Sequence, residues 1–349
     1  MNQNTLEYPI PEEISKTLVA MPKVELHVHL EGFVDFPFWQ EMTQAQGSWS
    51  PDKAKEMEDH FNFVDFNQFL QCFGAVLHSF KGPDDFHRLT LMALEKLRNQ
   101  GVQYVEMMMT PSFFLSQGIP FSDLMTAIDQ AAKEAEGQGG PKMKLLFDGP
   151  RNFGVDVVKQ NFALALQDPT GRVIGVGLGG DEAHFPARDF QEPFAWAKAE
   201  GLKLTCHAGE AAPESSIGEA IELLGAQRIG HGLGIIAKGP VEELIFKHNI
   251  GIDLCPHSNL ATGVLPNLES HPLLEYLSRG YSISLNSDDP GFFKTHVLKE
   301  YQWAYAHQNI RLDHLCEISQ RSVEQSFLEP SEKNRLKMDI RQFQIDLQD

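Results

Sequence analysis

Five separated segments of the chain carry side chains that commonly bind metal ions, each at the end of an apolar, strand-like run. Because these segments lie between residues 27 and 289, they can share one site only if the fold gathers the ends of its strands. The (β/α)₈ barrel does this, since its functional side chains collect at the C-terminal ends of parallel strands. The donor atoms are imidazole nitrogens and carboxylate oxygens, which suit a catalytic zinc ion with an open coordination position. The five segments are 27–29, 207–210, 230–232, 255–257 and 288–289.

Eight short β-rich runs alternate with amphipathic helical patterns, and this alternation predicts a parallel α/β barrel. Several runs place Val, Ile or Leu at successive positions, as strands buried on both faces do. The predicted strands are 24–30, 103–109, 143–147, 172–178, 203–207, 228–231, 250–254 and 281–286. The predicted helices between them are 85–99, 121–135, 192–199, 217–224, 241–247 and 273–278. We expect a single domain over residues 1–349, with extra helices after the first strand (33–99) and from Thr295 onward.

The composition narrows the class of protein. A length of 349 residues is ordinary for an α/β barrel with additions, and 42% hydrophobic residues can form a large core. The formal net charge of −19 argues against nucleic acid or an anionic membrane as a partner. Four well-separated cysteines without a CxxC pair favour a reduced, cytosolic protein, and neither a signal peptide nor a membrane span is visible.

Four residues form the predicted metal site. His27 and His29 are two apart on a strand, so both side chains face the same side; solvated or core histidines are the alternative. His207 ends the fifth strand and offers a third nitrogen, and Asp288 ends the eighth and offers an oxygen. The fourth strand ends in the segment 177–182 without a lysine that could bridge two metals, which favours one ion.

Three further residues are predicted to act in catalysis. Glu210 follows His207 by three residues and could carry protons, although a carboxylate that favours a helix N-terminus is the alternative. His231 lies between two glycines and could orient a water molecule, or it could be a core histidine bonded to a carbonyl. Asp289 could face the site or belong to a surface turn before Pro290. Their joint occurrence at strand ends favours one site.

These motifs resemble those of the adenosine deaminase family. They are PKVELHVHLEG (22–32), GLGGDE (177–182), CHAGE (206–210), RIGHG (228–232), LCPHSN (254–259) and LNSDDP (285–290). The resemblance implies a barrel with one zinc ion per chain, held by His27, His29, His207 and Asp288. It implies that Glu210 protonates N1 of a 6-aminopurine and that His231 and Asp289 position the attacking hydroxide. It also implies contacts from Asp289 to N7 and from the Gly180 N–H to N3.

For the residues predicted to contact the substrate, the sequence leaves alternatives open. Phe66, Phe69, Leu70 and Phe73 are spaced as one helix face, which predicts either helix core or, by the resemblance, a gate over the base. Vertebrate-type members usually have Asp where Glu31 stands, holding the ribose 5′-hydroxyl, and Asp where Gly177 stands. The chain is more similar to the bacterial branch, which includes deaminases of adenine and of aminodeoxyfutalosine.

We therefore expect a cytosolic zinc aminohydrolase that converts a 6-aminopurine nucleoside, first of all adenosine to inosine and ammonia. Aminodeoxyfutalosine is the second candidate substrate and free adenine the third. A non-catalytic ligand-binding barrel is one alternative, and a two-metal hydrolase of amides or phosphoesters is another. No phosphate-binding loop is present, which makes a nucleotide substrate less favoured. The sequence does not indicate an oligomeric state.

Overall fold

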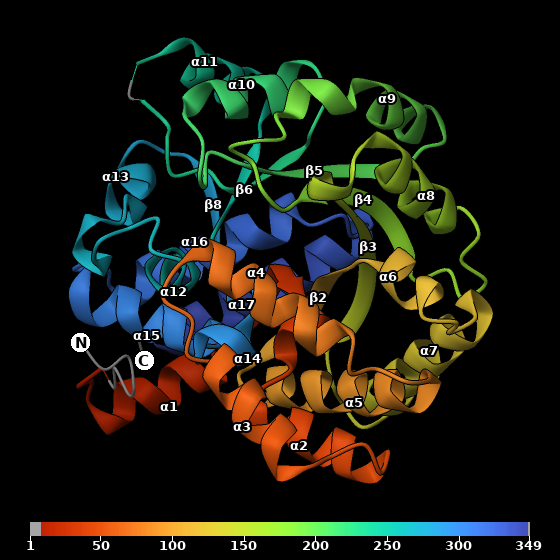
Figure 1. Ribbon diagram of the computed structural model, residues 1–349. Helices are drawn as coiled ribbons and strands as arrows, with labels where there is room; N and C mark the ends of the chain where they lie inside the picture. Colours follow the sequence, from red (N-terminus) through yellow and green to blue (C-terminus); the bar gives the residue numbers. More distant parts are fainter. Residues whose placement is uncertain (1–7, 237, 348–349) are drawn as a thin grey trace.

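The structure, a computed structural model, describes residues 8–236 and 238–347 and contains an eight-stranded parallel barrel surrounded by helices (Figure 1). Neighbouring strands pair in chain order from first to last. The strands are β1 (Lys23–His29), β2 (Val102–Met109), β3 (Lys142–Pro150), β4 (Val173–Gly179), β5 (Lys203–Ala208), β6 (Arg228–His231), β7 (Gly251–Leu254) and β8 (Ser282–Leu285). The predicted (β/α)₈ fold is confirmed, and each strand overlaps its predicted range. That residues 1–349 form one domain stays a prediction.

The helices of the outer layer follow from amphipathic patterns and end signals. They are α5 (Pro83–Asn99), α6 (Pro111–Ser116), α7 (Phe121–Gly137), α8 (Val155–Ala165), α9 (Gln191–Ala199), α10 (Glu214–Glu222), α11 (Pro240–His248), α12 (Pro256–Ala261) and α13 (Leu273–Ser278). In α5, Pro83 occupies the first turn, where a missing N–H costs nothing, and apolar side chains bury one face. The prediction placed the start of α10 at Ile217, which is too late. Its first turn, Glu214–Ser216, is polar and lies outside the apolar pattern.

The barrel interior below the strand ends contains a buried ion-pair network rather than apolar side chains alone. The Arg228 guanidinium of β6 lies 2.6 Å from Glu106 on β2 and 3.0 Å from Asp253 on β7, and all three side chains are fully buried. Arg228 also donates to the Leu26 carbonyl of β1. Buried charges must be paired, because an unpaired one costs several kcal/mol. The network therefore fixes β6 relative to β1, β2 and β7, below the strand ends where the candidate site lies.

The barrel closes between β1 and β8 through an isolated bridge rather than a ladder. The His29 N–H donates to the Asp288 carbonyl at 2.8 Å, and the Asp288 N–H donates to the His27 carbonyl at 3.1 Å. The Asn286 side-chain oxygen accepts from the N–H groups of Leu26 and His27. The segments that carry three of the predicted ligands therefore also close the barrel.

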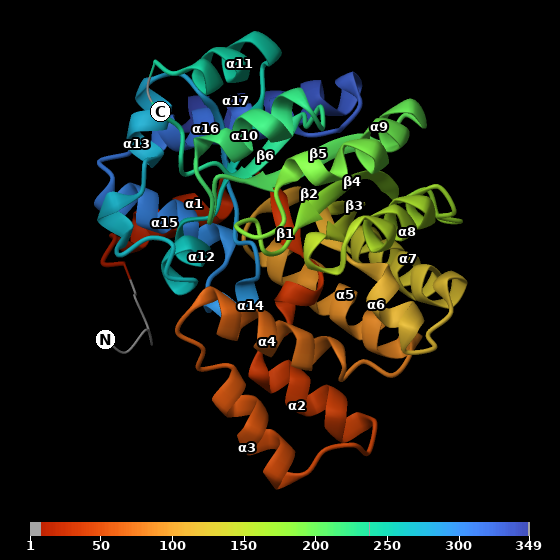
Figure 2. The same ribbon diagram turned by 45° about the horizontal axis from the view of Figure 1, so that its top comes forward.

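Additional helices extend the barrel as predicted. Between β1 and α5 lie α2 (Phe36–Ala45), α3 (Pro51–His60) and α4 (Phe66–Leu77), and α4 lies between the other two and the barrel (Figures 1 and 2). Near the two chain ends lie α1 (Glu12–Ala20), α14 (Pro290–Phe293), α15 (Val297–His307), α16 (Leu312–Gln325) and α17 (Pro330–Asp346). None of the described helices combines the length and apolarity needed to cross a membrane. The four cysteines are all free and buried.

Candidate metal and catalytic site

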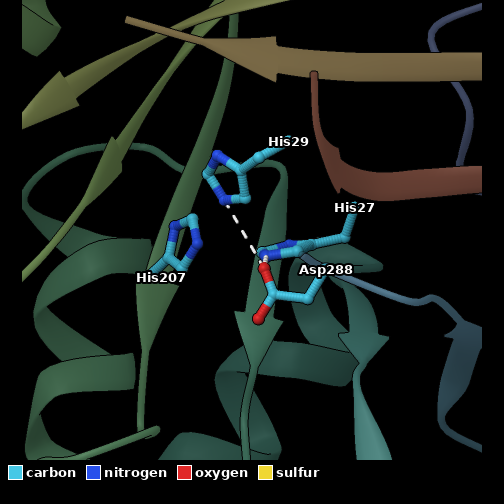
Figure 3. Close-up of side chains that lie close together, drawn as sticks. All are labelled: His27, His29, His207 and Asp288. Atoms are coloured by element: carbon cyan, nitrogen blue, oxygen red, sulfur yellow. Dashed lines mark ion pairs between the residues drawn. The ribbon is translucent and has the colours of Figure 1, made fainter. Parts of the chain in front are cut away.

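Four predicted ligands converge at the C-terminal end of the barrel (Figure 3). His27 and His29 come from β1, His207 from β5 and Asp288 from the segment after β8, and their ligand atoms lie within 4.8 Å of one another. The Nε2 atoms of His27 and His29 are each 3.5 Å from Asp288 Oδ1. Ligand atoms that surround a tetrahedral zinc ion at about 2.0–2.1 Å are separated by about 3.3 Å. The two 3.5 Å separations are close to those of such a shell.

The hydrogen bonds around these residues leave ligand atoms of His27, His207 and Asp288 free to bind a metal ion. Both ring nitrogens of the buried His27 lack a hydrogen-bond partner among the described residues. An unpaired buried polar group costs about 1–3 kcal/mol, and a cation would satisfy one nitrogen. His207 Nδ1 contacts the Leu178 carbonyl at 3.1 Å, which places its proton there and leaves Nε2 free. The Ser258 hydroxyl donates to Asp288 Oδ2 at 2.6 Å, so Oδ1 stays available. The donor set fits a divalent ion such as zinc.

A second cluster shares part of this set, because Cys255 and His231 also lie within 4.8 Å of the ligand atoms of His27 and Asp288. A catalytic ion needs an open position on a cavity. His29, His207 and Asp288 line the cavity, whereas Cys255 is fully buried outside its lining. This difference favours the three-histidine set with Asp288 as the candidate metal site. 

The prediction that segment 255–257 contributes to the site is wrong for His257. Its Nδ1 lies 2.6 Å from Glu300 Oε2, and its Nε2 lies 2.5 Å from the Tyr8 hydroxyl. The residue falls in the first turn of α12, which directs its ring toward α15.

Two residues of the site have backbone angles that non-glycine residues rarely adopt. Asp288 has φ 62° and His231 has φ 65°, both in the left-handed region. At Asp288 this conformation ends the strand alternation, so Asp288 and Asp289 both line the cavity. Beside His231, Gly230 leaves room for the His27 ring: a Cβ atom there would lie 2.9 Å from His27 Nδ1 and closer still to Cε1. Any larger residue at position 230 would displace a predicted ligand.

Glu210 and His231 form a buried pair that can hold a proton. Glu210 Oε2 lies 3.6 Å from His231 Nε2. Burial and the nearby Asp288 charge raise the pKa of Glu210 well above its usual range, so the carboxyl group favours its protonated form. Burial lowers the pKa of His231 to about 3, which keeps the imidazole neutral. The Asn259 amide lies 3.0 Å from His231 Nδ1 and donates to it, which leaves the proton on Nε2, facing Glu210.

The remaining predicted residues also line this cavity of about 280 Å³. Asp289 Oδ1 and Glu31 Oε2 are buried without a partner among the described residues. Burial raises the pKa of Asp289 well above its usual range and that of Glu31 to about 7. Gly180 has φ 99°, and the loop that it begins is held by the Asn152 side chain, which accepts from the Asp181 N–H at 2.7 Å. These groups offer a bound ligand both hydrogen-bond donors and hydrogen-bond acceptors.

The helix α4 covers the cavity. All four predicted residues of α4 line it. Phe66, Leu70 and Phe73 are half-buried, and Phe69 is buried, with its ring centre 4.8 Å from that of Phe293 in α14. The apolar face therefore serves in part as core and in part as a wall of the cavity. Movement of α4 as a gate stays a prediction.

The sequence argument missed the residues that support the site. Ser258 and Asn259 bond to Asp288 and His231, and Glu182 bonds to the turn that carries Glu210. Asp148, at the end of β3, lines the cavity with Oδ1 unpartnered. The available signal was position, since each of these polar residues lies near or just after the C-terminal end of a strand. Glu182, Ser258 and Asn259 also lie within motifs already noted, whereas Asp148 lies in none.

Comparison with known proteins decides the family. A sequence model of the family described as adenosine deaminase matches residues 22–343.

The chain belongs to the adenosine deaminase family.

Relatives within the family have different substrates in their names. The chain is 32% identical to an aminodeoxyfutalosine deaminase of Streptomyces avermitilis, over 94% of this chain and 92% of the relative. It is 31% identical to an adenosine deaminase of Edwardsiella ictaluri, over 90% of this chain and 96% of the relative. The crystal structure of an adenine deaminase from Arthrobacter aurescens superimposes with a TM-score of 0.87 at 26% identity, covering 93% of this chain and 99% of that one. Family membership supports an enzyme that deaminates purine-type substrates.

Proposed function

We propose that the protein is a zinc-dependent hydrolase that deaminates a 6-aminopurine nucleoside, with adenosine as its first substrate. The observation that supports this proposal most is that the three-histidine and aspartate set lies together at the wall of a cavity that the buried Glu210 also lines. A metal set alone is common to many hydrolases. A buried acid that favours its protonated form beside that set fits a reaction in which a ring nitrogen must receive a proton.

Each residue has a proposed role in this reaction. His27, His29, His207 and Asp288 would hold the zinc ion. When bound, zinc would lower the pKa of a water molecule toward about 7. Glu210 gives its proton to N1 of the base, which makes C6 more open to attack by water.

Other residues orient the reactants in this proposal. His231 directs its Nε2 proton, and Asp289 its carboxyl group, toward the attacking water. Asp289, whose pKa burial raises well above its usual range, also donates to N7 in its acid form, and the Gly180 N–H donates to N3. The oxygen of water bonds to C6, one of its two protons passes to the departing amino group and the other restores the proton of Glu210. The C6–N bond then breaks, ammonia leaves, and the oxygen remains as the 6-oxo group.

Glu31 supports a nucleoside over a free base. Its Oε1 accepts from the Thr110 N–H at 3.1 Å, whereas its buried Oε2 has no partner among the described residues. A substrate hydroxyl that donates to Oε2 would remove the cost of this unpaired group.

Aminodeoxyfutalosine is a second candidate, supported by the Streptomyces avermitilis relative and by the rim of the cavity. There the rings of Phe113 and Phe153 are 5.2 Å apart, and Phe153 is 59% exposed. This partly exposed aromatic surface could pack against a substituent that extends beyond the ribose.

The test is ammonia release from adenosine, aminodeoxyfutalosine and adenine by the purified protein with its metal bound. We expect both nucleosides to exceed adenine in kcat/KM. No ammonia from any of the three would favour a ligand-binding barrel, and two tightly bound ions per chain would favour a two-metal hydrolase.

Glu31→Ala refines this test. It should lower kcat/KM for the preferred nucleoside by about 10-fold, because an unmade polar contact costs about 1–3 kcal/mol. Adenine, which has no sugar, should be affected far less. Equal losses on both substrates would show that Glu31 supports β1 instead.

A further inference from the structure

We propose that Glu182 is a positioning residue that holds Glu210 in the orientation needed to protonate the substrate. This proposal rests on the proposed function, since it assigns Glu210 the role of proton donor. Glu182 lies on the loop after β4, and Glu210 lies on the turn between β5 and α10. Glu182 acts through this turn, because Glu210 and Gly180 line the cavity and Glu182 lies outside its lining.

The carboxylate of Glu182 accepts from three successive backbone N–H groups. Its Oε1 lies 2.6 Å from the Gly209 nitrogen, and its Oε2 lies 3.0 Å from the nitrogens of both Glu210 and Ala211. The Ser216 hydroxyl, in the first turn of α10, also donates to Oε1. A carboxylate offers about four acceptor sites, so these four donors use its full capacity. Bonds to a charged acceptor are about twice as strong as neutral ones.

The turn needs such an acceptor because it follows the end of β5 and precedes α10, so neither ladder nor helix satisfies its N–H groups. Buried backbone N–H groups are almost always paired. Gly209 has φ 69° and packs against Ile217, which points the next peptides toward Glu182. The direction of these three N–H groups fixes the Cα–Cβ direction of Glu210.

Glu182 holds the backbone of Glu210, and the neighbouring residues of the site hold its carboxyl group at the far end of the side chain. It is nearly buried, with Oε2 3.6 Å from His231 Nε2. A shift of about 1 Å in a reacting group can cost about 10²-fold in rate. The negative charge of Glu182 also contributes, after burial and Asp288, to the raised pKa of Glu210. Glu182 therefore supports both the placement and the protonated form of the proposed acid.

Glu182→Gln, tested in the zinc-loaded full chain, keeps the shape of the side chain and replaces one acceptor oxygen with an NH₂ group. This group would face N–H donors, so at least one bond to the turn is lost. We expect kcat to fall about 10–100-fold, with one zinc ion per chain retained and KM within about 3-fold of the wild type. Glu192→Gln is the matched control: its carboxylate is 76% exposed in a surface pair with Lys159, and the variant should behave as the wild type.

Two inhibitors separate positioning from a general structural role. Purine riboside offers N1 to the acid, whereas 1-deazapurine riboside has a C–H group in its place. Glu182→Gln should weaken binding of the first by about the same factor as kcat/KM, and should leave the second unchanged. Equal weakening of both inhibitors, loss of zinc, or an unchanged kcat would overturn the proposal.

Hydrogen exchange provides a readout that needs no substrate. In Glu182→Gln the amide protons of Gly209, Glu210 and Ala211 should exchange faster, and unchanged exchange would overturn the proposal even if no 6-aminopurine is a substrate. Absence of ammonia release by the wild type would instead overturn the proposed function. If Glu182→Gln does not fold, Ser216→Ala is the second variant, because it removes one of the four hydrogen bonds to Glu182. It should lower kcat by about 3-fold with KM unchanged. A kcat equal to that of the wild type would count against the proposal.

Discussion

Gly230→Ala tests whether His27 is held in the geometry of a metal ligand. A Cβ atom at position 230 would clash most severely with His27 Cε1, well inside the 3.4 Å at which ordinary contacts begin, so the ring must move by about 1 Å. The rings of His207 and His231, with centres at 4.5 Å and 5.0 Å, restrict its escape. Metal sites tolerate deviations of about 0.2 Å. We expect zinc affinity to fall about 10–100-fold and overpacking to cost about 1–3 kcal/mol of folding stability.

The assay is competition for zinc between the protein and a chelator, with ammonia release and thermal unfolding measured on the same samples. Gly218→Ala is the matched control. It lies in α10, the nearest atom to its added Cβ is 3.4 Å away, and alanine in a helix interior should stabilise by about 0.5–1 kcal/mol. A Gly230→Ala protein with wild-type zinc affinity and activity would refute the assignment of His27 as a ligand.

Four further predictions follow from the same contacts. Glu210→Gln should retain zinc and lose about 10²–10⁴-fold in kcat; loss of zinc would make Glu210 a ligand. Ser258→Ala removes the hydroxyl bonded to Asp288 and should lower zinc affinity about 10-fold or more, which chelator competition measures. Chelation should lower the melting temperature, because His27, His29 and Asp288 close the barrel; equal values with and without zinc would contradict this. In a pH–rate profile, kcat/KM should fall as the pH rises through the raised pKa of Glu210, because only the acid form donates; activity that persists would reject this role.

The sequence predicted the barrel because its strands are short, apolar and regularly separated, and because parallel pairing needs no information beyond their order. The same reasoning placed His27, His29, His207 and Asp288 together, since the C-terminal ends of neighbouring strands share one face. These inferences depend on periodicity and on where strands end, which the order of residues contains.

The residues that hold the site in place do so through contacts that the periodicity of the sequence does not reveal. The bond from Ser258 to Asp288 joins residues 30 positions apart, and the bonds from Glu182 cross to the turn after the next strand. The direction of the His257 ring depends on the first turn of α12, which a strand-end pattern does not describe. The left-handed conformation of Asp288 belongs to the closing contact between β1 and β8, which no local preference specifies.

The most direct test of the account is the metal content of the active protein measured together with its deamination of adenosine and aminodeoxyfutalosine. We predict one zinc ion per chain, ammonia release that disappears on chelation and returns with zinc, and loss of both zinc and activity in His27→Ala and Asp288→Ala. Two ions per chain, or ammonia release that continues in the metal-free protein, would contradict it.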